Sequence, residues 1–328
     1  DLAIGGIAGS ELTIYDGENQ RACAWVYGNG DKVVTFVGLT FRNGLGKTNI
    51  GGGLSSGGVS IYESGQAIVR QCRFDSNHAE SDGGAMVVGE DSSVVIDSCV
   101  FIDNTSIRSG GAIYAVTSTV ELIDSRFEKN RSADGGGIFC SNSDLSAIQV
   151  TMRRNESAGF NTGNGAIYVH SDSSSNFWDS VFDGNVAVDG GAVHAFSNSS
   201  VLFSNCVLTE NIASDEGGGV WSQDASVAIG DSVLCENSPR QIYGGYQDLE
   251  GNIVSDQCGE ADCNGDGIVD LVQILDGTLT DDDGDGVPDV CDPCLGDITR
   301  NGVVDAADLG ILLAVWNTDG KSNPEADI

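Results

Sequence analysis

The sequence predicts an all-β fold, a solenoid of short parallel strands followed by a small module of acidic loops. A four-residue phrase of the type Phe-x-x-Asn returns every 25 to 30 residues along two thirds of the chain. A second phrase, of the type Gly-Gly-Ala-Ile, keeps step with it, and the residues after each glycine pair alternate in character. A fixed period of about 20–50 residues indicates a repeat fold. A two-residue alternation indicates strands, with the smaller aliphatic side chains facing inward.

The Phe-x-x-Asn phrase predicts one corner of each coil. Its clear copies are Phe74–Asn77, Phe101–Asn104, Phe127–Asn130 and Phe182–Asn185; looser ones begin at Met152, Leu208 and Leu234, and Phe41 with Asn43 makes a shortened first copy. About 26 residues per coil suffice for about three short strands, which predicts a right-handed parallel β-helix over residues 1–255 with coils about 4.8 Å apart. The phenylalanines are expected to stack in the core. The asparagines are expected to form one hydrogen-bonded column, made of Asn77, Asn104, Asn130, Asn155, Asn185, Asn211 and Asn237.

At these motifs the sequence resembles a known family. Paired phrases such as Gly110-Gly-Ala-Ile113 and Phe127-Glu-Lys-Asn130 are similar to the repeats of the polymorphic outer-membrane proteins. The resemblance covers about residues 35–250 and implies a secreted or surface-exposed β-helix. The membrane barrel of that family is not expected here, so barrel anchoring is not carried over.

The distribution of charge along the chain limits the kinds of partner that the protein can bind. Residues 1–154 hold 12 Lys/Arg against 18 Asp/Glu, a net of −6, whereas residues 155–328 hold 3 against 31, a net of −28. A nucleic-acid partner is therefore excluded. An anionic polysaccharide is disfavoured except near a basic cluster made of Arg70, Arg73, Arg126, Arg153 and Arg154. The sequence contains no run of 18 apolar residues, so no transmembrane segment is predicted. The chain opens on Asp1 within what looks like an incomplete coil, so we expect a processed or truncated chain.

The ten cysteines fall into different environments. Three of them, Cys72, Cys99 and Cys206, occupy a slot that other coils fill with serine, so buried free thiols are expected and an inter-coil disulfide is the alternative. Four others bracket the acidic loops: Cys258, Cys263, Cys291 and Cys294. These are expected to form disulfides in an oxidising, extracellular or cell-surface environment, with zinc as the alternative at the last two.

Three acidic loops have the ligand spacing of calcium sites, with glycine at the sixth position. The first offers Asp262, Asn264, Asp266, the carbonyl of Ile268, and Asp270. The second offers Asp281, Asp283, Asp285, the carbonyl of Val287, Asp289 and Asp292. The third offers Asp297, Thr299, Asn301, the carbonyl of Val303, Asp305 and Asp308. Calcium is therefore the expected cofactor, and a disordered acidic tail is the alternative.

The last loop runs into an apolar helix face made of Leu309, Leu312, Leu313 and Trp316. Loop and helix resemble one half of a type I dockerin over residues 296–318, before a tail over 319–328. The two earlier loops, within residues 256–295, resemble thrombospondin type 3 repeats. The dockerin resemblance implies a cohesin-like or surface-protein partner, whereas packing within the module is the alternative for the helix face.

Two functions fit the sequence. The regular repeat favours a structural, adhesive or carbohydrate-binding surface, with glycan stacking on a column made of Tyr114, Phe139, Tyr168, His194 and Trp221. The alternative is an extracellular polysaccharide lyase or glycoside hydrolase, although no catalytic constellation is clear. Glu128, Arg153 and Asp183 share one slot on successive coils, which predicts surface ion pairs. A catalytic site is expected, if present, at the insertions Leu45–Ser56 and Ala158–Asn164.

Overall fold

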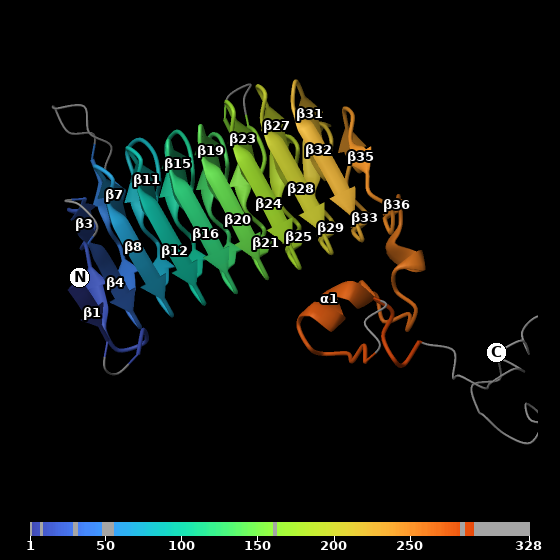
Figure 1. The fold of residues 1–328 in the computed structure, drawn as a ribbon, viewed down its shortest axis with the longest axis horizontal. Helices are drawn as coiled ribbons and strands as arrows, with labels where there is room; N and C mark the ends of the chain where they lie inside the picture. The colour runs from blue at the N-terminus through green and yellow to red at the C-terminus, as the bar shows by residue number, and fades with distance from the viewer. Residues whose placement is uncertain are drawn as a thin grey trace, which may run out of the picture. The chain divides into compact units, whose positions relative to one another are not determined.

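The computed structural model describes residues 2–6, 9–28, 32–47, 56–159, 163–282 and 286–291. The chain divides into two compact units, Asp1–Ala261 and Asp262–Ile328, which are described separately below. The first unit is a parallel β-solenoid of about eight turns, and the predicted all-β solenoid fold is confirmed. Figure 1 shows its strands as successive rows running from the blue N-terminal coils to the orange C-terminal one.

The strands form four parallel sheets, called A to D here, and every coil from β4 to β31 contributes one strand to each sheet. The coils at the two ends have no strand in sheet D among the described residues. Sheet A contains β1 (Leu2–Gly5), β4 (Val33–Val37), β8 (Gln66–Arg70), β12 (Ser93–Asp97), β16 (Thr119–Ile123), β20 (Asp144–Ile148), β24 (Ser174–Trp178), β28 (Ser200–Ser204), β32 (Ser226–Gly230) and β35 (Gln247–Asp248). Sheet B contains β2 (Ile14–Asp16), β5 (Thr40–Arg42), β9 (Arg73–Asp75), β13 (Val100–Ile102), β17 (Arg126–Glu128), β21 (Thr151–Arg153), β25 (Val181–Asp183), β29 (Val207–Thr209), β33 (Val233–Cys235) and β36 (Ile253–Ser255).

The other two sheets complete the coil. Sheet C contains β3 (Ala24–Tyr27), β7 (Val59–Tyr62), β11 (Met86–Gly89), β15 (Ile113–Val116), β19 (Ile138–Ser141), β23 (Ile167–His170), β27 (Val193–Phe196), β31 (Val220–Gln223) and β34 (Ile242–Tyr243). Sheet D contains β6 (Leu45–Gly46), β10 (His78–Ala79), β14 (Thr105–Ser106), β18 (Arg131–Ser132), β22 (Glu156–Ser157), β26 (Val186–Asp189) and β30 (Ile212–Glu216). The expectation of about three strands per coil missed sheet D, because most of its strands are only two residues long.

The core of the solenoid is built from stacked side chains. Phe74, Phe101 and Phe127 are fully buried, and their ring centroids lie 4.6 and 4.5 Å apart with nearly parallel planes. Met152 continues this column in register with Phe127. Stacking of like on like therefore fills the corner between sheets B and D without voids.

A glycine pair precedes strands of sheet C, and each of its two glycines is required for a different reason. The first glycine, as at Gly110, has φ +66°, a conformation that costs little only for glycine. The second, as at Gly111, has an ordinary φ, but a Cβ there would lie 2.1 Å from the carbonyl oxygen of Gly136 on the next coil. Close coil stacking, rather than backbone conformation, thus requires the second glycine.

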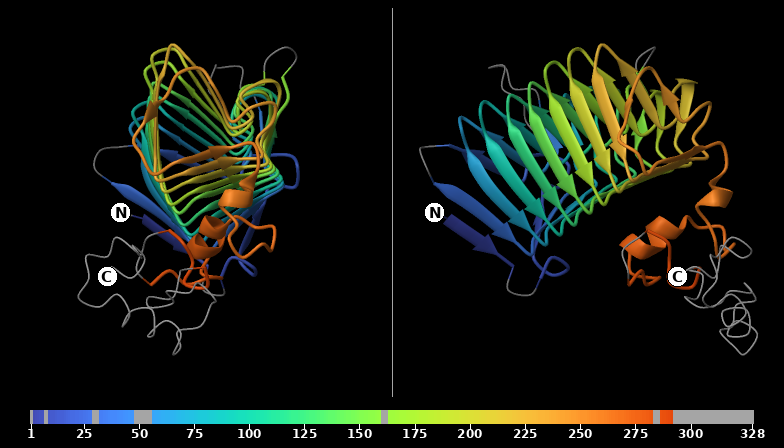
Figure 2. Two further views of the ribbon diagram at one scale, coloured as in Figure 1. Left: turned by 90° about the vertical axis from the view of Figure 1, so that its right-hand side faces the viewer. Right: turned by 45° about the vertical axis from the view of Figure 1, so that its right-hand side comes forward.

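The loops from sheet D to sheet C, called the D–C loops here, project beside the outer face of sheet C. Viewed along the axis, the chain of this unit bends inward between these loops and sheet C (Figure 2, left). In the last coil the short strands β34, β35 and β36 pair with β31, β32 and β33. A 3₁₀ turn, η1 (Cys258–Glu260), ends the first unit.

The described part of the second unit contains one short helix, α1 (Asp270–Leu275), which sequence analysis did not predict. The helix predicted from Leu309 to Trp316, the third acidic loop and the tail lie outside the described residues. No helix in the described part of the chain is long and apolar enough to cross a membrane.

Candidate functional site

A column of aromatic side chains runs along the outer face of sheet C. The strand register places Tyr114, Phe139, Tyr168, His194, Trp221 and Tyr243 on six successive coils. The first five are the predicted glycan-stacking residues, and Tyr243 adds the last coil. Ile113 and Ala115, the strand neighbours of Tyr114, are fully buried, whereas Tyr114 itself is half-buried. The column therefore lies on the outside of the coil rather than in the core.

The rings of this aromatic column mostly cover one another. Tyr114 and Phe139 stack at 5.1 Å and 12°, and His194 and Trp221 stack at 4.0 Å and 25°. Rings that stack along the axis turn their edges outward, so a sugar ring cannot lie flat on them. Tyr168 differs, because its plane is turned by 78° from both Phe139 and His194. The expected stacking platform is therefore limited to the surroundings of Tyr168.

A second, shorter row of rings flanks the aromatic column and was missed by sequence analysis. His170 and Phe196 lie two residues further along their strands, with centroids 5.8 Å apart. Tyr168 contacts His170 at 5.4 Å, and Phe196 contacts Trp221 at 6.2 Å. The alternation that revealed the first row also contained this one, because residues i and i+2 of a strand share a face.

His194 is the most buried member of the aromatic column, with 5% of its surface exposed. Burial lowers the pKa of its imidazole to about 3, so the ring is neutral at physiological pH. A hydrogen bond joins the ring to the backbone of Asp189, yet Nδ1 has no hydrogen-bond partner. Buried polar atoms are normally satisfied. This nitrogen is therefore the one unsatisfied polar atom of the aromatic column.

Carboxylates on the D–C loops and at the ends of two sheet D strands line up beside the aromatic column. An acidic row, defined here as Asp82, Asp134, Asp189 and Glu216, lies on coils that pair through the loop backbone. Asp134 is close enough to Tyr168 to help raise the pKa of the phenol, which burial and this charge bring to about 12. Asp82 likewise adds to the effect of burial in raising the pKa of Tyr114. The acidic row and the aromatic column therefore face one common surface.

Two carboxylates of the acidic row lack a cationic partner. Asp82 pairs with Arg108 and Glu216 pairs with Arg240, but Asp134 and Asp189 are in no ion pair among the described residues. Asp134 accepts a hydrogen bond from Asn164 Nδ2 at 2.9 Å. Burial raises the pKa of Asp134, and burial together with the charges of Asp215 and Glu216 raises the pKa of Asp189. The negative charges of Asp134 and Asp189, at the centre of this surface, are thus not balanced by an ion pair among the described residues.

The asparagine column lies inside the solenoid and has a structural role. Asn130 donates from Nδ2 to the carbonyl oxygen of Phe101 at 3.0 Å and to Oδ1 of Asn155 at 2.9 Å. Its own Oδ1 accepts from the backbone N–H and the Nδ2 of Asn104, each at 3.0 Å. The same bonds recur at the other members, which are Asn77, Asn104, Asn155, Asn185, Asn211 and Asn237.

The two ends of the asparagine column are closed by other groups. At the C-terminal end Gln241 Oε1 accepts from the backbone N–H of Asn237 at 3.2 Å and from its Nδ2 at 2.6 Å. At the N-terminal end the backbone N–H of Gly44 donates to Asn77 Oδ1 at 2.9 Å. The shortened first copy was therefore misaligned by one residue, since Gly44 and not Asn43 occupies the column position. Asn43 instead donates to Asp16 on the preceding coil.

In the second unit, the first acidic loop curls around the Asp262 carboxylate. Its two oxygens accept from the backbone N–H groups of Gly265, Asp266 and Gly267 at 2.8 to 3.2 Å. Asp270 Oδ2 accepts from the backbone N–H of Cys263, while its Oδ1 is buried and unpaired. Burial and the charges of Asp262 and Asp266 raise the pKa of Asp270.

The donor set of this loop fits a cation. Three mutually repelling carboxylates, a buried unpaired oxygen and a flexible backbone are what a calcium ion would stabilise. Asn264 and Ile268 are also present at ligand spacing. Gln273, at the twelfth position, donates from Nε2 to Asp266 and accepts from Asn264, so it holds the ligands together rather than adding a carboxylate.

The second acidic loop repeats the geometry of the first where it is described. Gly286 N–H donates to Asp281 Oδ2 at 3.0 Å, as Gly267 N–H does to Asp262 Oδ2 at 2.9 Å. Both glycines have φ +86°. Asp289 accepts from the backbone N–H of Asp282, and Val287 is half exposed. The remaining predicted ligands, namely Asp283, Asp285, Asp292 and all six of the third loop, lie outside the described residues.

The cysteines of the loops form two disulfides, and one partner was not foreseen. Cys263 bonds to Cys291, which links the first two loops. Cys258 bonds to Cys235, a strand residue of the solenoid. The first bond rules out zinc at the Cys291 sulfur, and Cys294 lies outside the described residues. A carboxylate oxygen of Asp270 lies within 4.8 Å of both sulfurs of the Cys263–Cys291 bond. Cys72, Cys99, Cys140 and Cys206 are buried free thiols.

Comparison with known proteins supports the solenoid. A model of the right-handed β-helix region matches residues 22–208, more than half of the chain. This chain belongs to the right-handed β-helix family. No curated protein and no solved structure matches it significantly. The family match covers the coils that carry the aromatic column up to His194 and leaves the acidic loops outside.

Of the ion pairs predicted along sheet B, only one joins two coils in the described part of the chain. Arg153 pairs with Asp183 on the next coil, whereas Glu128 pairs within its own coil, with Lys129 at 3.1 Å. A side-chain hydrogen bond from Lys129, together with the positive charges of Lys129, Arg126 and Arg153, lowers the pKa of Glu128. These groups stabilise the surface and are not arranged for catalysis. Of the two insertions, Leu45–Ser56 and Ala158–Asn164, residues 48–55 and 160–162 lie outside the described residues.

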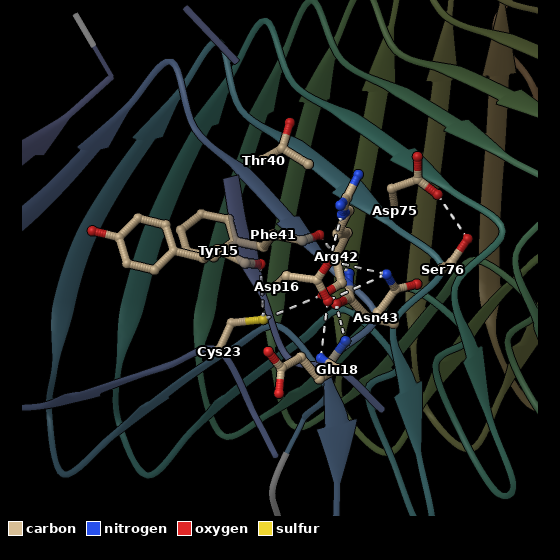
Figure 3. A network of polar contacts seen from close by, with 12 residues as sticks. Tyr15, Asp16, Glu18, Cys23, Thr40, Phe41, Arg42, Asn43, Asp75 and Ser76 are labelled. Atoms are coloured by element: carbon tan, nitrogen blue, oxygen red, sulfur yellow. Dashed lines mark hydrogen bonds and ion pairs between the residues drawn. The ribbon is translucent and has the colours of Figure 1, made fainter. Parts of the chain in front are cut away.

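A polar network occupies the first coils of the β-helix (Figure 3). Asp16 accepts from Arg42 Nε at 2.8 Å and from the backbone N–H of Glu18 at 2.9 Å. Cys23 Sγ lies 3.5 Å from the carbonyl oxygen of Tyr15. A neighbouring cavity of about 240 Å³ is lined by Tyr15, Asp16, Gly17, Arg21, Ala22 and Cys23. Burial raises the pKa of Cys23 to about 11, which keeps it a protonated, weakly reactive thiol.

Proposed function

We propose that this β-helix is a secreted or cell-surface protein that binds polysaccharide along the outer face of sheet C. One observation supports this most: an outward aromatic column runs without interruption over six coils beside the acidic row. Outward aromatic side chains in a continuous row are costly unless a ligand covers them. The regular repeat and the paired motifs also support a relationship to the polymorphic outer-membrane protein repeats, and hence an adhesive role.

The binding surface is centred on Tyr168. Its ring is turned away from the stack, while Phe196 and Trp221 extend the aromatic area beside it. A sugar unit placed on Tyr168 would contact ring edges on the neighbouring coils. The coils are about 4.8 Å apart, comparable with the length of one sugar unit, so an extended chain along the axis would place successive units on successive coils around Tyr168.

Retention on immobilised polysaccharides tests this function. A panel of plant, algal and microbial polysaccharides is compared for wild type, Tyr168→Ala and Asn176→Ala, the last being a change at a partly exposed position of sheet A. We expect retention on at least one polymer, lost in Tyr168→Ala but kept by every folded control. Retention on no polymer, or retention that Tyr168→Ala leaves unchanged, contradicts the proposal.

A glycoside hydrolase or lyase is the second candidate, favoured by one observation. Asp134 and Asp189 have raised pKa values, and they lie beside the aromatic column on the coils before and after that of Tyr168. Carboxyls with raised pKa serve as general acids in glycoside hydrolysis. The same panel decides between the two candidates: new reducing or unsaturated ends indicate an enzyme, whereas retention without new ends indicates a binding surface.

We also propose that the second unit binds calcium and serves as a rigid spacer or dock. Asp262, Asn264, Asp266, the carbonyl of Ile268 and Asp270 would hold one ion, and the bound charge would relieve their mutual repulsion. The disulfides support an oxidising compartment. A cohesin-like or other surface protein is the proposed partner of residues 296–318.

Calorimetry on EDTA-stripped protein tests the calcium proposal. Calcium at a hundredfold excess over its Kd is expected to stabilise the second unit by about 2.7 kcal/mol. Asp262→Asn should remove part of the binding heat, whereas Asp256→Asn, outside the loops, should not. The absence of heat from the wild-type protein would contradict a calcium site.

A further inference from the structure

We propose that the surface formed by the aromatic column and the acidic row selects a positively charged glycan, a polymer of amino sugars whose amines are free and protonated. This inference rests on the polysaccharide-binding function proposed above and adds the charge of the ligand to it. The two uncompensated carboxylates, Asp134 and Asp189, would each receive an ammonium group.

The charges on this surface are unbalanced in one direction. The D–C loops and the sheet D strands that lead into them carry Glu80, Asp82, Asp134, Asp189, Asp215 and Glu216. The described lysines and arginines of the same segments and of the last coil are Lys47, Arg108, Arg131 and Arg240. Lys47 lies on a coil before the aromatic column begins, and the three arginines are already paired, with Asp82, Glu156 and Glu216. The unpaired charge therefore remains at the middle coils, on either side of Tyr168. An anionic polymer would be repelled there, and a neutral one would leave these carboxylates partly desolvated without a partner.

His194 brings no positive charge to this surface. Its side chain is 5% exposed, and burial lowers the pKa of its imidazole to about 3, so the ring stays neutral although it is bonded to the backbone of Asp189. Two carboxylates without a neighbouring cation are complementary to a group that only donates, and an ammonium group has three donors and no acceptor.

The aromatic rings favour a glycan over an inorganic cation. An ammonium group also gains from aromatic faces within about 6 Å, and the sugar carbons that carry it would pack on Tyr168 and Trp221. Hydrated metal ions would gain little from such rings. A lysine-rich peptide shares the ammonium chemistry, so it is included as an outcome of the test.

The test compares two oligosaccharides that differ only in charge. A glucosamine hexamer with free amines and the same hexamer fully N-acetylated are titrated into the full-length protein by calorimetry. We expect the free-amine hexamer to bind at least about tenfold more tightly. Asp134→Asn and Asp189→Asn are each expected to weaken that binding about fivefold to tenfold. Asp144→Asn, on sheet A, is the matched control and should leave binding unchanged.

Each other outcome overturns the inference. Equal binding of both hexamers shows a neutral-glycan surface, which leaves the proposed function intact. Equal weakening by Asp144→Asn shows nonspecific attraction to an acidic protein. An oligolysine that binds as tightly, with the same dependence on Asp134 and Asp189, shows a peptide site. If neither hexamer binds while another polymer of the panel is retained through Tyr168, only the assigned charge of the ligand is overturned. If no polymer is retained, the proposed polysaccharide-binding function is overturned as well.

Discussion

The asparagine column and the aromatic column run side by side along the same solenoid, yet they differ in how completely their groups are satisfied. Every amide of the asparagine column has partners on the coils before and after it, as at Asn130. The aromatic column changes residue type from coil to coil, and its His194 Nδ1 is buried without a hydrogen-bond partner. The difference separates two roles: repetition with complete hydrogen bonding builds the fold, whereas the varied outer column is the surface for which we propose ligand binding.

Removing one amide from the asparagine column should have the largest effect. Asn130→Ala removes the partner of the backbone N–H of Asn104, of one of its two Nδ2 hydrogens and of the carbonyl of Phe101, all in the core. At 1–3 kcal/mol for each orphaned group, we expect a loss of about 4–6 kcal/mol in the free energy of unfolding, measured by chemical denaturation. Asn176→Ala, on the outer face of sheet A, should cost under about 1 kcal/mol. Similar losses for both variants would contradict the structural role.

A pair of phenylalanine substitutions measures the same contrast without polar groups. Phe127→Ala leaves a cavity between Phe101 and Met152 and should cost about 3–5 kcal/mol. Phe139→Ala removes a ring that is only half-buried on the outer face, so a loss of about 1–2 kcal/mol is expected from the area uncovered. Melting temperatures of the two variants decide the order, and a larger drop for Phe139→Ala would place the aromatic column in the core.

The buried histidine should make stability depend on pH. The pKa of His194 is lowered to about 3 in the folded state, so the unfolded chain binds a proton that the folded chain refuses. Stability is therefore fully present above an unfolded pKa of about 6.5 and falls as the pH drops toward the folded value, by up to about 1.4 kcal/mol per pH unit. His194→Gln should flatten that slope in denaturation curves taken between those limits. If the dependence of unfolding free energy on pH were unchanged in His194→Gln, protonation of the His194 ring in the folded state would cost no free energy.

The sequence alone determined the architecture of the first unit. The period of the Phe-x-x-Asn phrase, the alternation after each glycine pair and the stacking of like residues gave the solenoid, its core and its asparagine column. This was possible because in a solenoid each residue's main neighbours are its own counterparts one period away, so sequence spacing is spatial contact. The acidic-loop spacing was equally local, since all donors of one calcium loop lie within twelve residues.

Only the tertiary structure decided how the side chains of the outer surface are arranged. Which ring turns its face, as Tyr168 does, depends on how it packs against two neighbours and is not encoded in its own residue type. Asp134 and Asp189 each precede the glycine pair of their coil, so their position follows the repeat, but the approach of that position to the aromatic column depends on how the chain bends between sheets D and C. The bond between Cys235 and Cys258 was hidden as well, because it joins a strand of the repeat to a segment that has none.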